Sequence, residues 1–354
     1  MQHIGFGLWN WIAVIVYLVA MLLVGAYFTK RASQDTDSFF KASGRLPSWA
    51  IGFSIYATTL SAITFMSTPE KAFLTDWAYI AGNIAIVAII PILIAFYVPF
   101  FKKLHVTSAY EYLEARFGPS IRLIGSLLFI IFHLGRIAIV IYLPTLAITA
   151  VSDINPYIVA SLVGILCILY TFLGGFEGVV WSDFIQGVIL LGGALLIIII
   201  GAFEIKGGFG TIVHDAIANK KILSADNWKL NSAAAAIPII FLGNIFNNLH
   251  QYTASQDVVQ RYQASESMEE TKKSLWTNGV LALISAPIFY GMGTMMYSFY
   301  QHQETLPKGF NTSSIVPYFI LNEMPPFIGG LLIAAIFAAA QSTISSSLNS
   351  ISAC

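Results

Sequence analysis

The sequence predicts an all-α integral membrane protein built as a bundle of membrane-spanning helices. Only 10% of its 354 residues are charged and 57% are hydrophobic, whereas a soluble domain carries about 25% charged residues. Its apolar stretches reach the length of about 20 residues that a helix needs to cross the hydrocarbon layer. The spanning strands of a barrel are only about 9–11 residues long. The composition and the length of these stretches therefore both indicate a helical bundle in the lipid bilayer.

Nine stretches are long enough to cross a membrane. In chain order they run 8–28, 47–69, 78–101, 119–150, 155–173, 178–202, 235–255, 274–300 and 326–353. The first is not expected to be a cleaved signal peptide, because no lysine or arginine precedes it and Lys30 and Arg31 follow it directly. Cys167 and Cys354 lie in or at the end of apolar segments, and they predict no disulfide framework.

The placement of lysine and arginine predicts an outside amino terminus. If the segments alternate from there, six basic residues fall in outer connections, four of them in the long one that follows residue 202. Cytoplasmic loops carry the excess of basic residues, and here the inner connections hold the larger set: Lys30, Arg31, Lys41, Arg45, Lys102, Lys103, Arg116, Arg122, Arg261, Lys272 and Lys273.

Several classes of function are excluded by what the sequence lacks. The net charge is zero, so there is no basic footprint for nucleic acid. The sequence has no glycine-rich phosphate loop and no clustered spacing of His, Cys and carboxylates of the kind that metal enzymes use. We therefore expect no enzyme, and we expect any transport to draw on an ion gradient rather than on ATP.

A hydroxyl ladder runs through the last apolar stretch. Ala339, Ser342, Thr343 and Ser346 recur at spacings of three and four, with Ser345 beside them, so their oxygens share one face of a helix. A hydroxyl in hydrocarbon is costly unless something occupies its lone pairs. Several uncharged oxygens can replace the hydration shell of a small cation. The alternative is helix packing through small residues, which favours the same residue types.

Two of the nine segments carry polar clusters at mid-membrane depth. The first is the run from Ala57 to Thr64, and the second is the run from Gly243 to Asn248, which continues through His250, Gln251 and Gln256. Transporters use interrupted helices of this kind to aim backbone groups at ions and substrates, although hydrogen-bonded helix packing would also explain them. In the predicted topology the two segments run in opposite directions and each leads a series of helices, which is the order of two inverted repeats.

Two ionisable residues lie in apolar surroundings. Arg136 is near the centre of 119–150, where a guanidinium costs at least about 2.5–3.5 kcal/mol. A carboxylate on a substrate would fit its planar fork; the alternative is an internal ion pair, for which Asp183 is the obvious partner. Asp183 should lie nearer the inner face, so we do not expect a direct pair. For Asp183 itself, an ion site or inner gate competes with a solvated carboxylate at the start of a helix.

Three runs of sequence resemble the signatures of the sodium:solute symporters. They are Leu173–Gln186, Ser255–Tyr262, and the hydroxyl ladder followed by Leu348-Asn349-Ser350. Within this family the chain is most similar to the bacterial sialic acid sodium symporters, with the best agreement at Ala57–Ser67, at Thr107–Phe117 and around Arg136.

The resemblance implies one transmembrane domain, 1–354, with a LeuT-type fold. Segment 8–28 would be an extra amino-terminal helix, 47–202 the first five-helix repeat, and 235–354 the first three helices of the second repeat. Family members continue beyond the position of Cys354 with further helices, so the second repeat is expected to be truncated here.

The resemblance also implies where ions and substrate bind. A first sodium site would use the backbone carbonyls of Ala57, Leu60 and Ala339 with the hydroxyls of Ser342 and Thr343. A second sodium site would use Asp183, Ser342, Ser345 and Ser346. Arg136 would hold the carboxylate of a sugar acid, and the other substrate contacts would be Thr59, Ser61, Thr64, Tyr79 and Asn83. Asn83 stands where the subgroup has a glutamine, so a shorter amide is expected there.

The implied function is sodium-coupled uptake of a carboxylate-bearing sugar, sialic acid, across the cell membrane by alternating access. Sodium ions, the small-molecule substrate and the bilayer would be its partners. Two alternatives remain open at this point: a symporter of the same family for proline, a monocarboxylate or another sugar, and a membrane sensor that binds its ligand without transport.

Overall fold

The computed structural model describes residues 6–104, 106, 108–149, 154–230, 236–303 and 305–354, and every regular element among them is helical. Helices occupy all nine predicted membrane segments, although Ala150 and Ala235 at the edges of two segments, and Thr107 in a family-like run, lie outside the described residues. The helices of these segments are α1 (Leu8–Ala32), α3 (Ser48–Thr59), α4 (Ala62–Leu74), α5 (Ala81–Ile92), α6 (Val98–Lys103), α8 (Pro119–Thr149), α9 (Pro156–Glu204), α11 (Ile237–Ala254), α13 (Met268–His302) and α15 (Ile328–Ser352).

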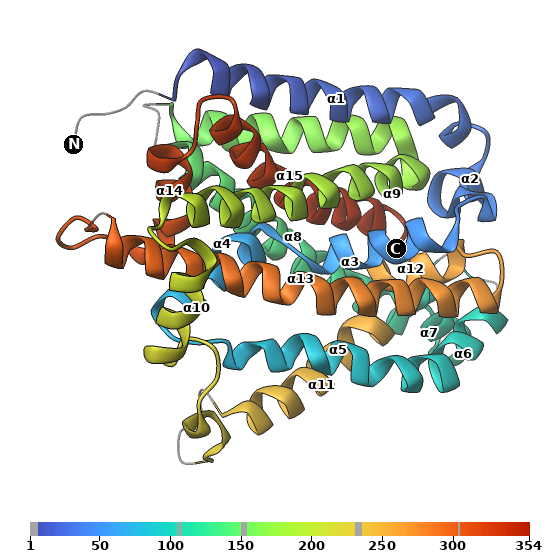
Figure 1. Cartoon of the computed structure of the whole chain (residues 1–354). Coiled ribbons are helices and arrows are strands. Elements are labelled where there is room, and N and C mark those ends of the chain that lie inside the picture. Colours follow the sequence, from blue (N-terminus) through green and yellow to red (C-terminus); the bar gives the residue numbers. More distant parts are fainter. Residues whose placement is uncertain (1–5, 105, 107, 150–153, 231–235, 304) are drawn as a thin grey trace.

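Shorter helices lie in the connections, and they mark the two ends of the bundle (Figure 1). α10 (Gly208–Ala218) and α14 (Ile315–Glu323) lie at the end where α1 begins, and α2 (Thr36–Lys41) and α7 (Ala109–Phe117) lie at the opposite end. α12 (Gln256–Ala264) lies toward that opposite end too, but its residues are mostly buried and it is no surface connection. Within the described residues, six helices are long and apolar enough to cross a membrane, and the bent pair of α3 and α4 makes a seventh span. The chain is therefore a multi-pass membrane protein.

Helix α9 contains two of the predicted segments, 155–173 and 178–202, joined at Gly175. That residue has a φ of 55° and a ψ of −157°, which interrupts the helix. A Cβ at this position would lie 2.9 Å from the Cβ of Ala32 and 3.1 Å from the carbonyl oxygen of Phe39. Glycine adopts a positive φ without steric cost, so it is suited to this turn. Figure 1 shows the chain doubling back here, and both α1 and α15 pack against α9.

Two helices are broken inside the bundle, and they run in opposite directions across it (Figure 1). α3 and α4 meet at Leu60 and Ser61, where the backbone is extended and the axis bends by 63°. α11 and α12 meet at Ser255 (φ −85°, ψ 122°). For Gly243–Asn248 the sequence left an interrupted helix and hydrogen-bonded packing open, and the interruption lies outside this cluster, near the Gln256 end of the same polar run. The cluster is continuous helix, in which Asn244 Nδ2 donates to the carbonyl oxygen of Ile240 at 2.8 Å.

Helix α13 packs against both halves of the first broken helix. Gly293 permits this contact with α4, because a Cβ on it would lie 2.1 Å from the carbonyl oxygen of Pro69. Small residues let helix backbones approach closely in membranes. The break at Leu60–Ser61 is thereby held between α13 and α15, both of which contact α4.

Two charged residues bind the long connection after α9 to the ends of α13 and α4. Asp215 of α10 accepts hydrogen bonds from Ser298 Oγ at 2.5 Å and His302 Nε2 at 2.9 Å, both on α13. Burial acts to raise the pKa of Asp215, but these hydrogen bonds hold that pKa below its ordinary value. Lys221 Nζ donates to the carbonyl oxygens of Phe73 (2.7 Å) and Leu74 (3.3 Å) at the end of α4, where a positive charge complements the helix dipole.

Replacing Asp215 with asparagine should destabilise the protein by about 1–3 kcal/mol, because Ser298 and His302 lose a charged acceptor. The folded-state pKa is lower than that of the unfolded chain. The carboxylate therefore contributes fully above about pH 4 and loses its contribution as the pH falls through the lowered pKa. Thermal unfolding in detergent at several pH values measures this loss of stability.

Asp226→Asn, in which an exposed carboxylate of the same connection is changed, is the matched control and should unfold like the unchanged protein. Equal unfolding midpoints for the Asp215 variant and the unchanged protein would contradict the prediction.

Candidate functional site

Five oxygens from α3, α15 and the break between α3 and α4 converge at the centre of the bundle. Ser342 Oγ lies 3.3 Å from the carbonyl oxygen of Ala57 and 3.2 Å from that of Ala339. Thr343 Oγ1 lies 3.3 Å from the carbonyl oxygen of Leu60 and 3.4 Å from that of Ala339. All five residues are buried. We call these atoms the first oxygen cluster, and the structure brings together every residue that the sequence assigned to the first sodium site.

The spacing of these oxygens suits a shared cation. Hydroxyl hydrogen bonds usually measure about 2.5–3.0 Å, whereas the four distances here are 3.2–3.4 Å. Oxygens at about 2.3–2.6 Å from one ion, the range known for Ca²⁺, stand about 3.3–3.7 Å apart when they subtend a right angle. The cluster is uncharged and enclosed, so it can replace the hydration shell of a monovalent ion without burying an anion.

The residues predicted for the second sodium site lie next to the first oxygen cluster, further toward the carboxyl end of α15. Ser346 Oγ is 3.5 Å from Asp183 Oδ2, and Ser345 Oγ donates to the carbonyl oxygen of Ser342 at 3.2 Å. Asp183 is fully buried, so it is not a solvated carboxylate at a helix start. Its Oδ1 has no hydrogen-bond partner among the described residues. We call the Asp183 carboxylate and the hydroxyls of Ser342, Ser345 and Ser346 the second oxygen cluster.

Arg261 lies against the second oxygen cluster, and its placement in an inner connection was wrong. Its side chain is only 1% exposed, and its Nη2 donates to Asp183 Oδ2 at 2.9 Å and to Ser346 Oγ at 2.8 Å. Its Nε donates to Ser54 Oγ at 2.9 Å. Arg261 belongs to the run Ser255–Tyr262, which matched the family signature as a whole. This match to the family signature could have indicated that Arg261 is not a solvent-exposed loop residue.

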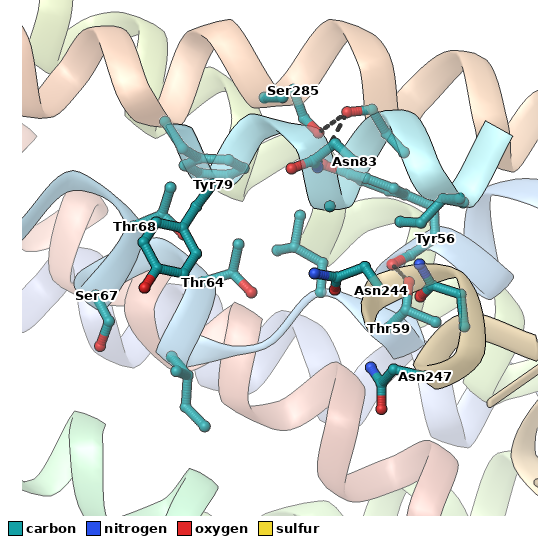
Figure 2. Close-up of a pocket in the computed structure, with 18 of the residues that line it drawn as sticks. Tyr56, Thr59, Thr64, Ser67, Thr68, Tyr79, Asn83, Asn244, Asn247 and Ser285 are labelled. Carbon is teal, nitrogen blue, oxygen red and sulfur yellow. Dashed lines mark hydrogen bonds between the residues drawn. The ribbon is translucent and has the colours of Figure 1, made fainter. Parts of the chain in front are cut away.

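A cavity of about 580 Å³ opens beside the broken helix. Of the six predicted substrate contacts, it is lined by Thr59, Thr64, Tyr79, Asn83 and Arg136, and Ser61 is not among its lining residues. Ser61 lies at the break itself, where its backbone N–H donates to Thr64 Oγ1 at 3.5 Å. Figure 2 shows Thr64 of α4 and Asn244 of α11 pointing into the same space, with Asn83 on another side.

The polar lining of this cavity is larger than the sequence predicted. The amide groups of α11 lie along one wall (Figure 2). The polar cluster at Gly243–Asn248, for which a helix interruption was considered, therefore faces the cavity. The additional polar residues are Tyr56, Ser67, Thr68, Lys71, Asn244, Asn247, Asn248, Gln251, Ser285 and Tyr290.

The cavity carries positive charge. Lys71 and Arg136 line it, and none of its described lining residues is a carboxylate. Lys71 Nζ lies 4.9 Å from the centre of the Tyr79 ring, a cation–π contact. Asp257, which lies outside the lining, offsets the charge of Arg136. The charge of Lys71 is faced by no carboxylate among the described lining residues, and it favours an anionic ligand over a neutral or cationic one.

Arg136 forms an internal ion pair, but not with Asp183. Its Nη1 lies 3.1 Å from Asp257 Oδ2 on α12, and its Nη2 donates to the carbonyl oxygen of Thr58 at 2.9 Å. The expectation that Arg136 and Asp183 do not pair is confirmed. The side chain is still 18% exposed, so Arg136 connects both broken helices while it faces the cavity.

Broken helices that enclose a polar cavity beside an uncharged oxygen cluster define a secondary transporter. The chain belongs to the sodium:solute symporter family, whose family model matches residues 39–354. The predicted family and the transporter class, as opposed to an enzyme, are therefore confirmed.

Individual relatives agree with this assignment. The chain is 49% identical to the sodium/sialic acid symporter SiaT of Proteus mirabilis (strain HI4320), over 100% of this chain and 71% of that protein. It is 48% identical to the sodium/sialic acid symporter NanT of Aliivibrio fischeri (strain ATCC 700601 / ES114), over 100% of this chain and 70% of that protein. The human sodium-coupled monocarboxylate transporter 1 is 29% identical over 98% of this chain and 58% of that protein.

A solved structure resembles the whole described fold. It is the substrate-bound, outward-open state of a Na⁺-coupled sialic acid symporter, matched with a TM-score of 0.95 and 49% identity over 99% of this chain and 74% of that one. The predicted all-α, LeuT-type fold is thereby confirmed.

Proposed function

We propose that the protein couples the inward movement of sodium to the uptake of sialic acid. The observation that carries this proposal is that one helix break borders both the first oxygen cluster and the cavity. Leu60 contributes its carbonyl oxygen to the first oxygen cluster, and the same residue lines the positively charged cavity beside Thr59 and Arg136. The proposed substrate is the one named for the relatives that are 48–49% identical to the chain.

The cavity suits a sugar acid in size and chemistry. Its volume of about 580 Å³ falls within the range of about 300–1,000 Å³ that is usual for small-molecule sites. In the proposal, the guanidinium of Arg136 holds the carboxylate, and Thr59, Thr64 and Asn83 hydrogen-bond the sugar while Tyr79 shields it from outside. Sodium ions occupy the first and second oxygen clusters.

Coupling in this proposal is a difference in affinity. Sodium in the first oxygen cluster holds the carbonyls of Ala57 and Leu60 in the geometry of the break, and that geometry shapes the cavity. Sodium therefore favours the state that binds substrate well, and substrate must favour the state that binds sodium. Alternating access then releases both on the inner side.

The proposed location is the cytoplasmic membrane, with the amino terminus outside. Removing the buried Arg261 from the predicted inner set of eleven leaves ten basic residues on the inner side against six on the outer side. This distribution still supports the orientation under the positive-inside rule.

A monocarboxylate is the second candidate substrate, because the cavity's positive charge would hold any carboxylate. A monocarboxylate transporter is also among the relatives. Proline and neutral sugars fit less well, since no carboxylate for an amine is found among the described lining residues and the positive charge gives a neutral sugar no advantage.

Calorimetric titration of the purified full-length protein with sialic acid, first in sodium and then in potassium, tests the function. We expect binding in sodium and at least tenfold weaker binding in potassium, a difference of about 1.4 kcal/mol. Equal binding in both salts would show that substrate binding is not coupled to sodium. Tighter binding of lactate than of sialic acid would favour the monocarboxylate candidate, and binding without uptake into proteoliposomes would make the protein a sensor.

Replacing Arg136 with alanine should abolish sialic acid uptake while much of the sodium binding remains. Loss of a charged hydrogen-bonding partner costs about 2–5 kcal/mol, so we expect the Kd for sialic acid to rise at least about 30-fold. Arg136→Lys should be intermediate, because lysine keeps the charge but not the fork. Unchanged uptake by the alanine variant would remove Arg136 from the substrate site.

Replacing Ser342 with alanine should weaken sodium dependence more than any other single change in the ladder. Its hydroxyl belongs to both oxygen clusters, whereas those of Thr343 and Ser345 each belong to one. Proteoliposome uptake measured against sodium concentration should show a larger rise in half-saturating sodium for Ser342→Ala than for Thr343→Ala or Ser345→Ala. A smaller rise for Ser342→Ala would show that the two clusters do not share this oxygen.

A further inference from the structure

Four charged residues of alternating sign connect the cavity to the second oxygen cluster. Arg136 Nη1 lies 3.1 Å from Asp257 Oδ2, and the backbone carbonyl oxygen of Asp257 accepts a hydrogen bond from Arg261 Nη1 at 2.5 Å. Arg261 Nη2 lies 2.9 Å from Asp183 Oδ2. We call Arg136, Asp257, Arg261 and Asp183 the charge chain; it draws on α8, α12 and α9.

The charge chain is almost completely shielded from solvent. The side chains of Asp257, Arg261 and Asp183 are 0–1% exposed, and that of Arg136 is 18% exposed. Buried pairs of this kind are a weak source of stability, because the cost of desolvation can exceed the attraction between the charges. Their placement between two proposed ligand sites therefore suggests a functional reason.

Both carboxylates of the chain have spare capacity to accept a partner. Asp257 Oδ1 and Asp183 Oδ1 are buried, and neither has a hydrogen-bond partner among the described residues. Buried polar atoms are usually paired. Each carboxylate thus has one oxygen held by an arginine and one oxygen that is open to a new cation or donor.

Arg261 occupies two of the oxygens that a second sodium ion would use. Its Nη2 donates to Asp183 Oδ2 and to Ser346 Oγ at 2.8–2.9 Å, and both atoms belong to the second oxygen cluster. A guanidinium and a metal ion repel each other and compete for the same lone pairs. Sodium can bind there tightly only when Arg261 gives up part of its hold on Asp183.

We infer that the charge chain couples substrate to the second sodium ion, an inference that rests on the proposed function. A substrate carboxylate at Arg136 weakens the hold of Arg136 on Asp257. Asp257 then attracts Arg261, to which its carbonyl oxygen is already bonded, and Arg261 releases Asp183 and Ser346 to sodium. One anion is added at one end of the chain and one cation at the other, so the alternation of charge is kept. Asp257 and Arg261 are positioning residues in this scheme, since neither lines the cavity.

Titration of sialic acid into the full-length protein at several sodium concentrations, with ionic strength held constant by potassium, tests the inference. The slope of log Kd against log sodium concentration reports how many sodium ions are taken up with substrate. We expect a slope of about two in magnitude for the unchanged protein and about one for Asp257→Asn, because linkage to the second site is lost. Ser345→Ala, which alters the second oxygen cluster but not the chain, should also give about one, and the double variant should fall no further.

Two further variants separate coupling from a structural role. Asp257→Glu restores the carboxylate and should restore most of the slope. Asp215→Asn changes a buried carboxylate outside the chain and should keep the full slope. If Asp257→Asn does not fold, Arg136→Lys replaces it, because lysine cannot hold the substrate and Asp257 through one planar fork, and its slope should also be about one.

The possible failures are distinguishable. A slope near zero in the unchanged protein, or no sialic acid binding, would overturn the proposed function itself. A slope of about two that persists in Asp257→Asn would overturn the charge chain and leave the proposed function standing. A slope of about one in the unchanged protein would also overturn the coupling role of the charge chain, since no second sodium ion would then be coupled to the substrate.

Discussion

The break at Leu60–Ser61 exposes backbone carbonyls inside a membrane protein, and the rest of the site depends on how they are satisfied. In a bilayer every backbone polar group needs a partner within the protein, because no water is available in the hydrocarbon. The carbonyl of Ala57 faces Ser342, that of Thr58 accepts from Arg136, and that of Leu60 faces Thr343. The break is stable because three side chains from two other helices bind the carbonyl oxygens that helical N–H groups would otherwise have bonded.

Much of this arrangement could be predicted from local sequence. Hydropathy located nine apolar segments that are helical in their described residues, since the length and composition of each are properties of the segment alone. The hydroxyl ladder could be assigned to one helix face, because the spacing within a helix is fixed. Arg136 stood out because its environment in the chain is apolar for many residues on both sides.

What the sequence could not provide was the pairing of distant charges and the position of the second break. Arg261 and Asp183 are 78 residues apart, and nothing local shows which cation will meet which carboxylate. Arg261 was assigned to a connection because its neighbours are polar, yet α12 packs against α15, α3 and α6 inside the bundle. The sequence could not show where in the polar run from Gly243 to Gln256 the break lies, because polar side chains that face a cavity leave the same pattern as a helix interruption.

The two oxygen clusters are connected to the cavity in physically different ways. The first shares backbone with it, since Leu60 both supplies a carbonyl oxygen and lines the cavity; an ion and a substrate there stabilise the same bend directly. The second shares no lining residue with the cavity, so any influence must cross the intervening side chains. Packed apolar side chains change position little when a charge is added nearby, whereas buried charges of alternating sign shift their contacts when a new ion binds at either end. A bundle that must respond to ions at both clusters thus has a reason to retain Asp257 and Arg261 in its interior, at a desolvation cost that packing alone would not justify.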